Sequence, residues 1–65
     1  MNTKLEILEH LKEILKMEGT AGSMYAEIST SVQNPALISF FKELAEEEKH
    51  HAEIVRNMIS LLENP

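Results

Sequence analysis

The sequence contains no cysteine, and it has only two glycines and two prolines among its 65 residues. Without cysteine the chain can form neither a disulfide nor a thiolate metal site, so a cysteine-rich structural zinc site is excluded. A chain this short, folded alone, buries only about 60% of the surface that its unfolded form exposes. Its stability must therefore come from helix packing, oligomerisation, metal ligands other than sulfur, or a combination of these.

Clustered basic residues and long apolar runs are also missing. The formal net charge is −5, and without a basic patch to neutralise phosphates we do not expect nucleic-acid binding. No apolar run approaches the roughly 20 residues that a membrane span needs, and residues 1–4 lack the apolar segment of a signal peptide. We expect a cytoplasmic protein without a membrane partner, and enclosure in a larger protein shell is compatible with these absences.

What the sequence has in abundance is helix-forming residues: leucine, isoleucine, glutamate, lysine, alanine and methionine dominate, and runs of β-branched residues are absent. The clearest interruption is Asn34-Pro35, where proline suits the first position of a helix and asparagine suits its N-cap. We therefore predict an all-α fold, a single domain over residues 1–65, with a helix over about 3–32, a turn at 33–34 and a helix over about 35–62.

Residues 19–23 form the one segment that challenges this assignment. Gly19 and Gly22, with short hydroxyl residues beside them, are typical of a loop, which would give three helices. The alternative is a continuous helix that is kept thin so that another helix can approach closely. Each glycine costs a helix up to about 1 kcal/mol, so a close approach would have to offset that cost.

Three polar residues occupy positions that the helical repeat assigns to the buried side. In the second helix, Glu48 and His51 continue an apolar stripe with steps of three and four residues: Leu37, Phe41, Leu44, Val55, Met58 and Leu62. In the first helix, Glu18 continues a similar stripe: Leu8, Leu11, Leu15, Gly22, Tyr25 and Val32.

A buried carboxylate must be protonated, hydrogen-bonded, paired with a cation or bound to a metal. Neither stripe carries a lysine or arginine, except for Lys4 at the start of the first helix. The options that remain for Glu18 and Glu48 are a shifted pKa, a pairing with His51, or a metal ion.

A two-helix hairpin exposes its apolar side, so we expect two copies to form a four-helix bundle about a two-fold axis. The symmetry would bring two copies each of Glu18, Glu48 and His51 together. Their four carboxylates carry a charge of −4, which two divalent ions would balance. Glu48 and His51 lie one helical turn apart, so both can reach one ion. Carboxylate and imidazole ligands suit iron, manganese and zinc.

This arrangement resembles the di-iron carboxylate pattern of ferritin-like proteins, in which one glutamate from each of two helices joins a Glu-x-x-His from each of the other two. The segment Glu18-x-x-Ala21-x-x-x-Tyr25 resembles the first metal helix of rubrerythrins. The segment from Ala45 to Ala52, with Glu48-x-x-His51, resembles the second. The spacing of the two motifs in one hairpin is most similar to encapsulated ferritins, and the resemblance covers about residues 5–62.

The resemblance implies a role for each matched position. Glu48 would bridge two irons, Glu18 would be a terminal ligand, His51 would bind one iron through a ring nitrogen, and Tyr25 would lie near a carboxylate. The implied cofactor is iron, two ions per dimer, with manganese or zinc as substitutes. The implied activity is oxidation of Fe(II) by dioxygen or peroxide for iron storage or detoxification.

The implied partners are a second copy, a higher even-numbered oligomer and an encapsulin-type shell that holds the protein. Encapsulated ferritins dock into such a shell through a C-terminal tail, whereas this sequence ends at Pro65. They also carry further acidic residues beside the first metal glutamate, where Met17 and Gly19 stand here. The cysteine-rich rubredoxin module of rubrerythrins is absent from this chain, which excludes electron transfer through such a module within it.

Other hypotheses stay open at this point. A rubrerythrin-like enzyme that reduces peroxide with a separate electron donor would use the same ligands. A non-catalytic dimerisation module would use them as a polar layer that fixes the register of the bundle. Glu47-x-x-His50 is a competing ligand register that fits the apolar repeat less well. An acidic patch near the start of the chain suits a solvated face or a weak cation-collecting surface: Glu6, Glu9, His10 and Glu13.

Overall fold

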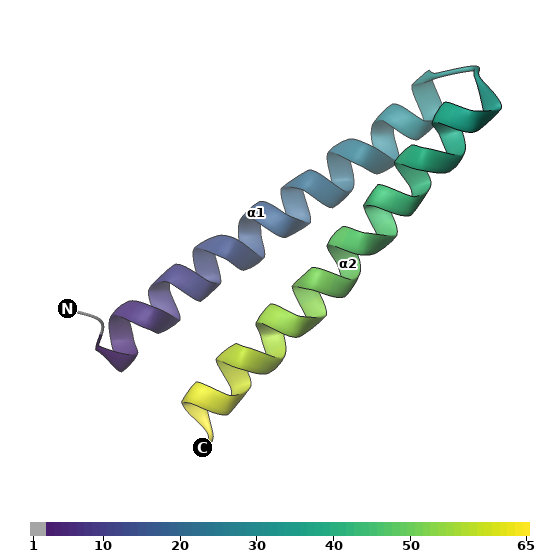
Figure 1. The fold of residues 1–65 in the computed structure, drawn as a ribbon. Helices are drawn as coiled ribbons and strands as arrows, with labels where there is room; N and C mark the ends of the chain where they lie inside the picture. The colour runs from purple at the N-terminus through teal and green to yellow at the C-terminus, as the bar shows by residue number, and fades with distance from the viewer. Residues whose placement is uncertain (1–2) are drawn as a thin grey trace.

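The computed structural model describes residues 3–65. Met1 and Asn2 lie outside the described residues. They are part of the domain expected over residues 1–65 and of the N-terminal segment in which no signal peptide is expected. Two helices, α1 (Lys4–Ser31) and α2 (Pro35–Glu63), make up nearly all of the rest. They lie side by side and antiparallel, so that the start of α1 and the end of α2 share one end of the molecule (Figure 1).

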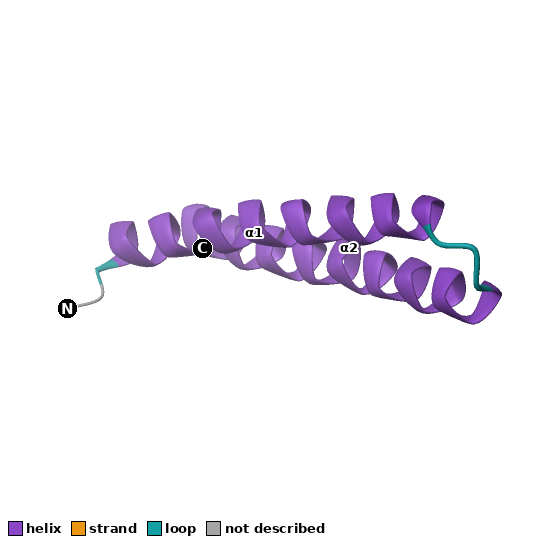
Figure 2. Cartoon of the chain, turned by 90° about the horizontal axis from the view of Figure 1, so that it is seen from above, coloured by secondary structure: helices purple, strands orange, loops and turns teal. Residues whose placement is uncertain are grey.

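The described part of the chain has no strand, which confirms the predicted all-α hairpin. It measures 47 × 18 × 14 Å, an elongated rod rather than a globule, as the second view also shows (Figure 2). The helices begin and end within one residue of the ranges expected from the sequence. Neither helix contains a stretch that is both long enough and apolar enough to cross a membrane.

Asn34 and Pro35 start α2 as the sequence indicated. Asn34 is the N-cap, and its side-chain oxygen accepts hydrogen bonds from the backbone amides of Ala36 and Leu37 at 2.9 and 3.3 Å. These bonds satisfy two of the amides that a helix N-terminus leaves without a partner, and Pro35 removes a third because it has no N–H. The turn between the helices is therefore encoded locally, by two consecutive residues.

Thr3 starts α1 through a capping box. Its hydroxyl accepts a hydrogen bond from the backbone amide of Glu6 at 3.2 Å, and the Glu6 carboxylate accepts one from the backbone amide of Thr3 at 3.4 Å. Such a cap is worth about 1 kcal/mol. The Glu6 carboxylate also places negative charge in the first turn, where the helix dipole favours it.

The loop considered for residues 19–23 is wrong, because α1 runs through them without a break. Both glycines keep ordinary helical angles, since no residue of the described chain has a positive φ. Thr20 donates its hydroxyl to the carbonyl of Lys16 at 3.1 Å, so its polar group is satisfied within the helix. Glycine lowers helix propensity but does not forbid the conformation, and contact with α2 can decide in favour of the helix.

The interior of the hairpin is small. Only Ser29 of α1 and Ala45, Ala52 and Val55 of α2 are buried among the described residues. Nine large apolar side chains of the described hairpin are exposed. The helical repeat of 3.6 residues places all of them except Leu5 on one side of the pair, and we call this set the apolar face: Ile14, Met17, Met24, Leu37, Phe40, Ile54, Met58 and Leu61. A monomeric protein rarely leaves so many large apolar side chains together in water.

The two glycines of α1 differ in what surrounds them. A Cβ added at Gly22 would lie 3.3 Å from the Cβ of Glu48, whereas one added at Gly19 would meet nothing within 4 Å. We expect Gly19→Ala to stabilise the chain by up to about 1 kcal/mol through helix propensity. We expect Gly22→Ala to lose that gain, because Glu48 can withdraw only if α2 moves.

Urea unfolding of the two variants, without metal, measures the difference directly. The matched pair isolates the contact, because both variants make the same chemical change three residues apart. Equal stabilisation by the two substitutions would show that the close approach of α1 and α2 at Gly22 carries no energetic weight.

Candidate metal centre

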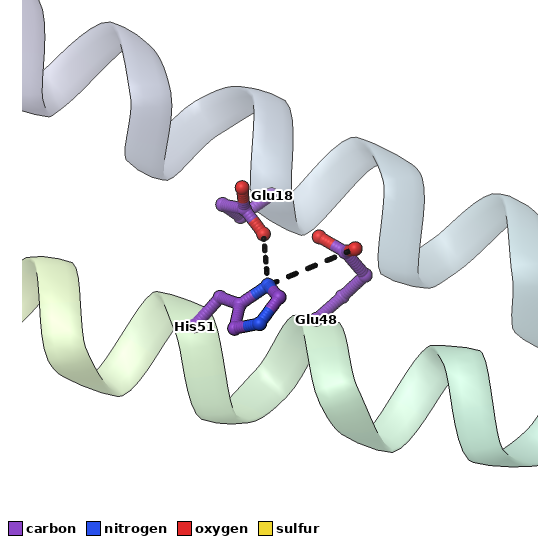
Figure 3. A network of polar contacts seen from close by, with 3 residues as sticks. All are labelled: Glu18, Glu48 and His51. Carbon is purple, nitrogen blue, oxygen red and sulfur yellow. Dashed lines mark hydrogen bonds and ion pairs between the residues drawn. The ribbon is translucent and has the colours of Figure 1, made fainter.

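Glu18, Glu48 and His51 meet near the middle of the hairpin. Glu18 extends from α1 toward α2, while Glu48 and His51 extend from successive turns of α2 toward α1 (Figure 3). One ligand atom of each residue lies within 4.8 Å of the corresponding atoms of the other two. The structure thus brings together three side chains that lie up to 33 residues apart in the sequence.

The histidine ring holds the group together in the absence of metal. His51 Nδ1 lies 3.3 Å from Glu18 Oε2, at hydrogen-bonding distance, and 3.9 Å from Glu48 Oε1. The Glu18 and Glu48 side chains are 24% and 18% exposed, whereas that of His51 is 52% exposed. The carboxylates therefore lie inside the helix pair, and the imidazole lies at the edge of the site.

Small residues let the two helices approach at this level. Gly22, one turn after Glu18, lies against the base of the Glu48 side chain, and Ala45 and Ala52 are buried on either side of Glu48 along α2. Bulkier residues at these points would move the two backbones apart and separate Glu18 from the α2 ligands. The sequence indicated that α1 is thin here, but it did not identify Gly22 as the contact that sets the distance to Glu48. The signal was its position on the same stripe as Glu18, four residues on.

No lysine or arginine neutralises the carboxylates. Within residues 3–65, His51 is the sole ion-pair partner of Glu18 and of Glu48. The pKa of Glu48 is accordingly raised above its ordinary value, first because its side chain shares a hydrogen bond with Glu18, then because of partial burial, and then because of the Glu18 charge. His51 acts in the opposite direction and lowers it. Two partly buried carboxyl groups this close together favour a state that holds a proton.

This raised pKa sets the pH dependence of the metal-free protein. The folded state binds the Glu48 proton more tightly than the unfolded state does. The resulting contribution to stability is fully present below the ordinary glutamate pKa and is lost as the pH rises through the raised value. We expect the melting temperature of chelator-treated protein to fall as the pH rises from the ordinary glutamate pKa through the raised pKa of Glu48.

Circular dichroism melting curves of the wild type and of Glu48→Gln test this expectation. The amide cannot titrate, so the variant should lose less stability over the same interval. Equal slopes for the two proteins would assign the pH dependence to other groups.

The donor set fits a transition-metal ion. Two carboxylates and one imidazole suit iron, manganese and zinc, whereas calcium and magnesium prefer oxygen ligands alone. A cation at this point would also relieve the repulsion between Glu18 and Glu48 that raises the pKa of Glu48. One chain supplies three ligand side chains, which is too few to surround a pair of metal ions.

The other residues considered from the sequence lie outside this group. The ring of Tyr25 stacks on that of Phe41, with centroids 6.3 Å apart and an angle of 29° between the planes. Within residues 3–65 its hydroxyl makes no hydrogen bond to Glu18 or Glu48, so its role beside a carboxylate stays a prediction. Glu47 and His50 are exposed and belong to no ligand group found in the described chain. The register Glu48-x-x-His51 is the one that faces Glu18.

Comparison with known protein families gives a match over most of the chain. A sequence model of the Rubrerythrin family matches residues 9–64, which include all three side chains of the candidate metal centre. Comparisons with curated proteins and with solved structures give no match. The family match covers most of the chain, so it extends beyond the ligand motif to most of both helices.

Proposed function

This chain belongs to the rubrerythrin family, and we propose that it is a di-iron protein that oxidises Fe(II) at a site shared between two copies. The observation that carries the proposal is the convergence of Glu18, Glu48 and His51, with ligand atoms within 4.8 Å of one another. These residue types, on two helices of one hairpin, are half of the ligand set of a ferritin-like four-helix bundle.

The second half of the site would come from a second copy. The apolar face defined above leaves large side chains in water, and a two-fold axis would cover it with the same face of the partner. His51 belongs to that side of α2, because Ile54 and Met58 of the apolar face lie three and seven residues after it. Dimerisation would therefore complete the core and enclose two sets of ligands in one step. Such dimers would assemble further into a higher even-numbered oligomer.

The proposed reaction balances with Fe(II) as the reductant. Two Fe(II) ions lose one electron each, and one dioxygen takes up two electrons and two protons to give hydrogen peroxide. With peroxide as the oxidant, two electrons and two protons give two water molecules. Glu48 would hold both ions, Glu18 and His51 would hold one each, and the four carboxylates of the dimer would balance the charge of two divalent ions.

The family match favours a second candidate within the same chemistry. A rubrerythrin-like enzyme would reduce peroxide repeatedly, with electrons from a separate donor. The two activities differ in the measured product: storage leaves oxidised iron with the protein, whereas peroxide reduction returns the iron to Fe(II) at the expense of the donor. Consumption of the electron donor in proportion to peroxide, with no growth of an iron mineral, would identify the peroxide-reducing activity.

The test of the proposal is metal content together with native mass. After anaerobic addition of Fe(II), the purified protein should bind about one iron per chain. Its native mass should be that of an oligomer with an even number of chains, and this oligomer should be more stable with Fe(II) than without it. Admission of dioxygen should then consume about one oxygen for two irons, as the electron balance requires. A chain that binds no iron and keeps its mass would be a non-catalytic helical module in which the inward carboxylates form a polar layer.

A further inference from the structure

A groove runs between α1 and α2 and reaches the carboxylates of the candidate metal centre. It has a volume of about 820 Å³, and its lining includes both site carboxylates together with small residues of α1 and α2: Glu18, Gly19, Gly22, Ser23, Ala45 and Glu48. His51 does not line it, and neither does any residue of the apolar face. A partner that covers the apolar face would therefore leave this groove open to solvent.

Gly19 has no packing role within the described hairpin. Its added Cβ would meet nothing within 4 Å, so no close contact offsets the cost of a glycine in the middle of a helix. A larger side chain at position 19 would instead project into the groove beside Glu18. The missing side chain keeps open the space next to the carboxylates.

Charged side chains of both signs line the groove. Lys42, Lys49 and Arg56 are spaced seven residues apart along α2, and all three line it. They are half of the six lysine and arginine residues of a chain with net charge −5. One of them, Lys49, is paired with Glu46 at 3.1 Å. Glu46 and both site carboxylates line the groove as well, so its lining carries three acidic and three basic side chains. Such a mixed lining does not oppose the entry of a small uncharged molecule.

We propose that this groove is the route by which a small uncharged oxidant, dioxygen or hydrogen peroxide, reaches the carboxylate side of the metal centre. The inference rests on the proposed function above, because it assigns a path to the oxidant of that reaction.

The test fills the groove with a side chain at position 19, where glycine leaves it open. Gly19→Leu places a side chain beside Glu18 and raises helix propensity, so the fold should survive. Thr20→Leu is the matched control, because Thr20 is the exposed neighbour of Gly19 and does not line the groove. Ser23→Leu, one turn further along the groove lining, serves as a second blocking variant if Gly19→Leu fails to fold.

Iron oxidation is measured in single-turnover experiments after anaerobic loading, with dioxygen and with peroxide in separate arms. We expect both blocking variants to lower the rate constant about tenfold, with unchanged iron content and native mass, while Thr20→Leu matches the wild type. The arm in which the rate falls identifies the oxidant that uses the groove. Unchanged rates in both arms would overturn the proposal. An altered native mass would also overturn it, because the groove would then be a contact between copies.

A second readout needs no bound metal. Dissolved dioxygen is paramagnetic, and it speeds the relaxation of nuclear spins that it contacts. In metal-free protein we expect greater enhancement at the amide protons of Gly19, Gly22 and Ser23 than at Thr20, and loss of that difference in Gly19→Leu. Equal enhancement at all four positions would contradict the groove as an oxygen path. If the wild type binds no iron, the proposed function fails, and this experiment still decides whether dioxygen occupies the groove.

Discussion

We expect Glu48→Ala to abolish stable iron binding and to lower the rate of iron oxidation by about a hundredfold or more. Residues that only orient metal ligands cost 10- to 100-fold when mutated, and Glu48 is assigned as a direct ligand of both ions. In a two-fold dimer the substitution removes two of the four carboxylates at once. Two Fe(II) ions would then face a charge of −2, and the site would lose its electrostatic balance.

Glu46→Ala is the matched control for this variant. Glu46 is the same residue type two positions earlier, its side chain is 72% exposed, and it is paired with Lys49 on the surface. Exposed pairs of this kind contribute little to stability, so Glu46→Ala should keep both iron content and rate. Metal content by elemental analysis and oxygen uptake after Fe(II) addition are the two measurements.

Loss of activity in Glu48→Ala must also be separated from loss of structure. In the metal-free chain the pKa of Glu48 is raised first by the hydrogen bond shared with Glu18, then by partial burial and by the Glu18 charge, so the charged form of Glu48 is disfavoured there. Removing one of two facing carboxyl groups should therefore leave the helical content without metal close to that of the wild type. A folded Glu48→Ala protein that still oxidises iron at the wild-type rate would contradict the assigned site.

The helix ends were predictable because their signals are local. Asn34-Pro35 fixes the start of α2, because asparagine caps a helix N-terminus and proline suits the first position of a helix. The conformation at Gly19 and Gly22 was not predictable in this way, because glycine occurs both in loops and where a helix must be thin. Only the position of α2 distinguishes these cases, and that depends on contacts between residues far apart in the sequence. The sequence therefore left open whether α1 is broken, and the structure decided it.

The ligand group was predictable as a pattern, but its geometry was not. Periodicity placed Glu18, Glu48 and His51 on apolar stripes, and the three do converge. The same periodicity did not show that the imidazole is half exposed while the carboxylates lie between the helices. It also did not show which residues of each stripe pack against the other helix of the hairpin and which stay exposed. Leu37 and Met58, expected inside, are 44% and 46% exposed in the hairpin, because one helix cannot cover so wide a stripe.

The remaining exposed surface leads to a second large effect. We expect Phe40→Glu to raise the dissociation constant of the dimer about a hundredfold or more and to remove bound iron with it. Phe40 is 60% exposed in the hairpin, so in a monomer its substitution should change stability by no more than about 0.5 kcal/mol. Burying the 60% of Phe40 that the hairpin leaves exposed is worth about 1–2 kcal/mol per copy, or about 2–4 kcal/mol for the two copies of a dimer. The variant would also bury two unpaired glutamates, which adds to that loss, and the sum reaches the roughly 2.7 kcal/mol that a hundredfold change represents.

The position of Phe40 makes this result specific to the interface. It lies eight residues before Glu48, about 12 Å along α2, so the substitution cannot reach the ligands directly. Ser39→Glu is the control, because it introduces the same charge at the neighbouring exposed residue outside the apolar face. Native mass across a dilution series, with iron content measured on the same samples, should show the wild type and Ser39→Glu as metal-loaded dimers and Phe40→Glu as a metal-poor monomer. If Phe40→Glu keeps both its mass and its iron, the apolar face is not the interface, and the site must draw its remaining ligands from elsewhere.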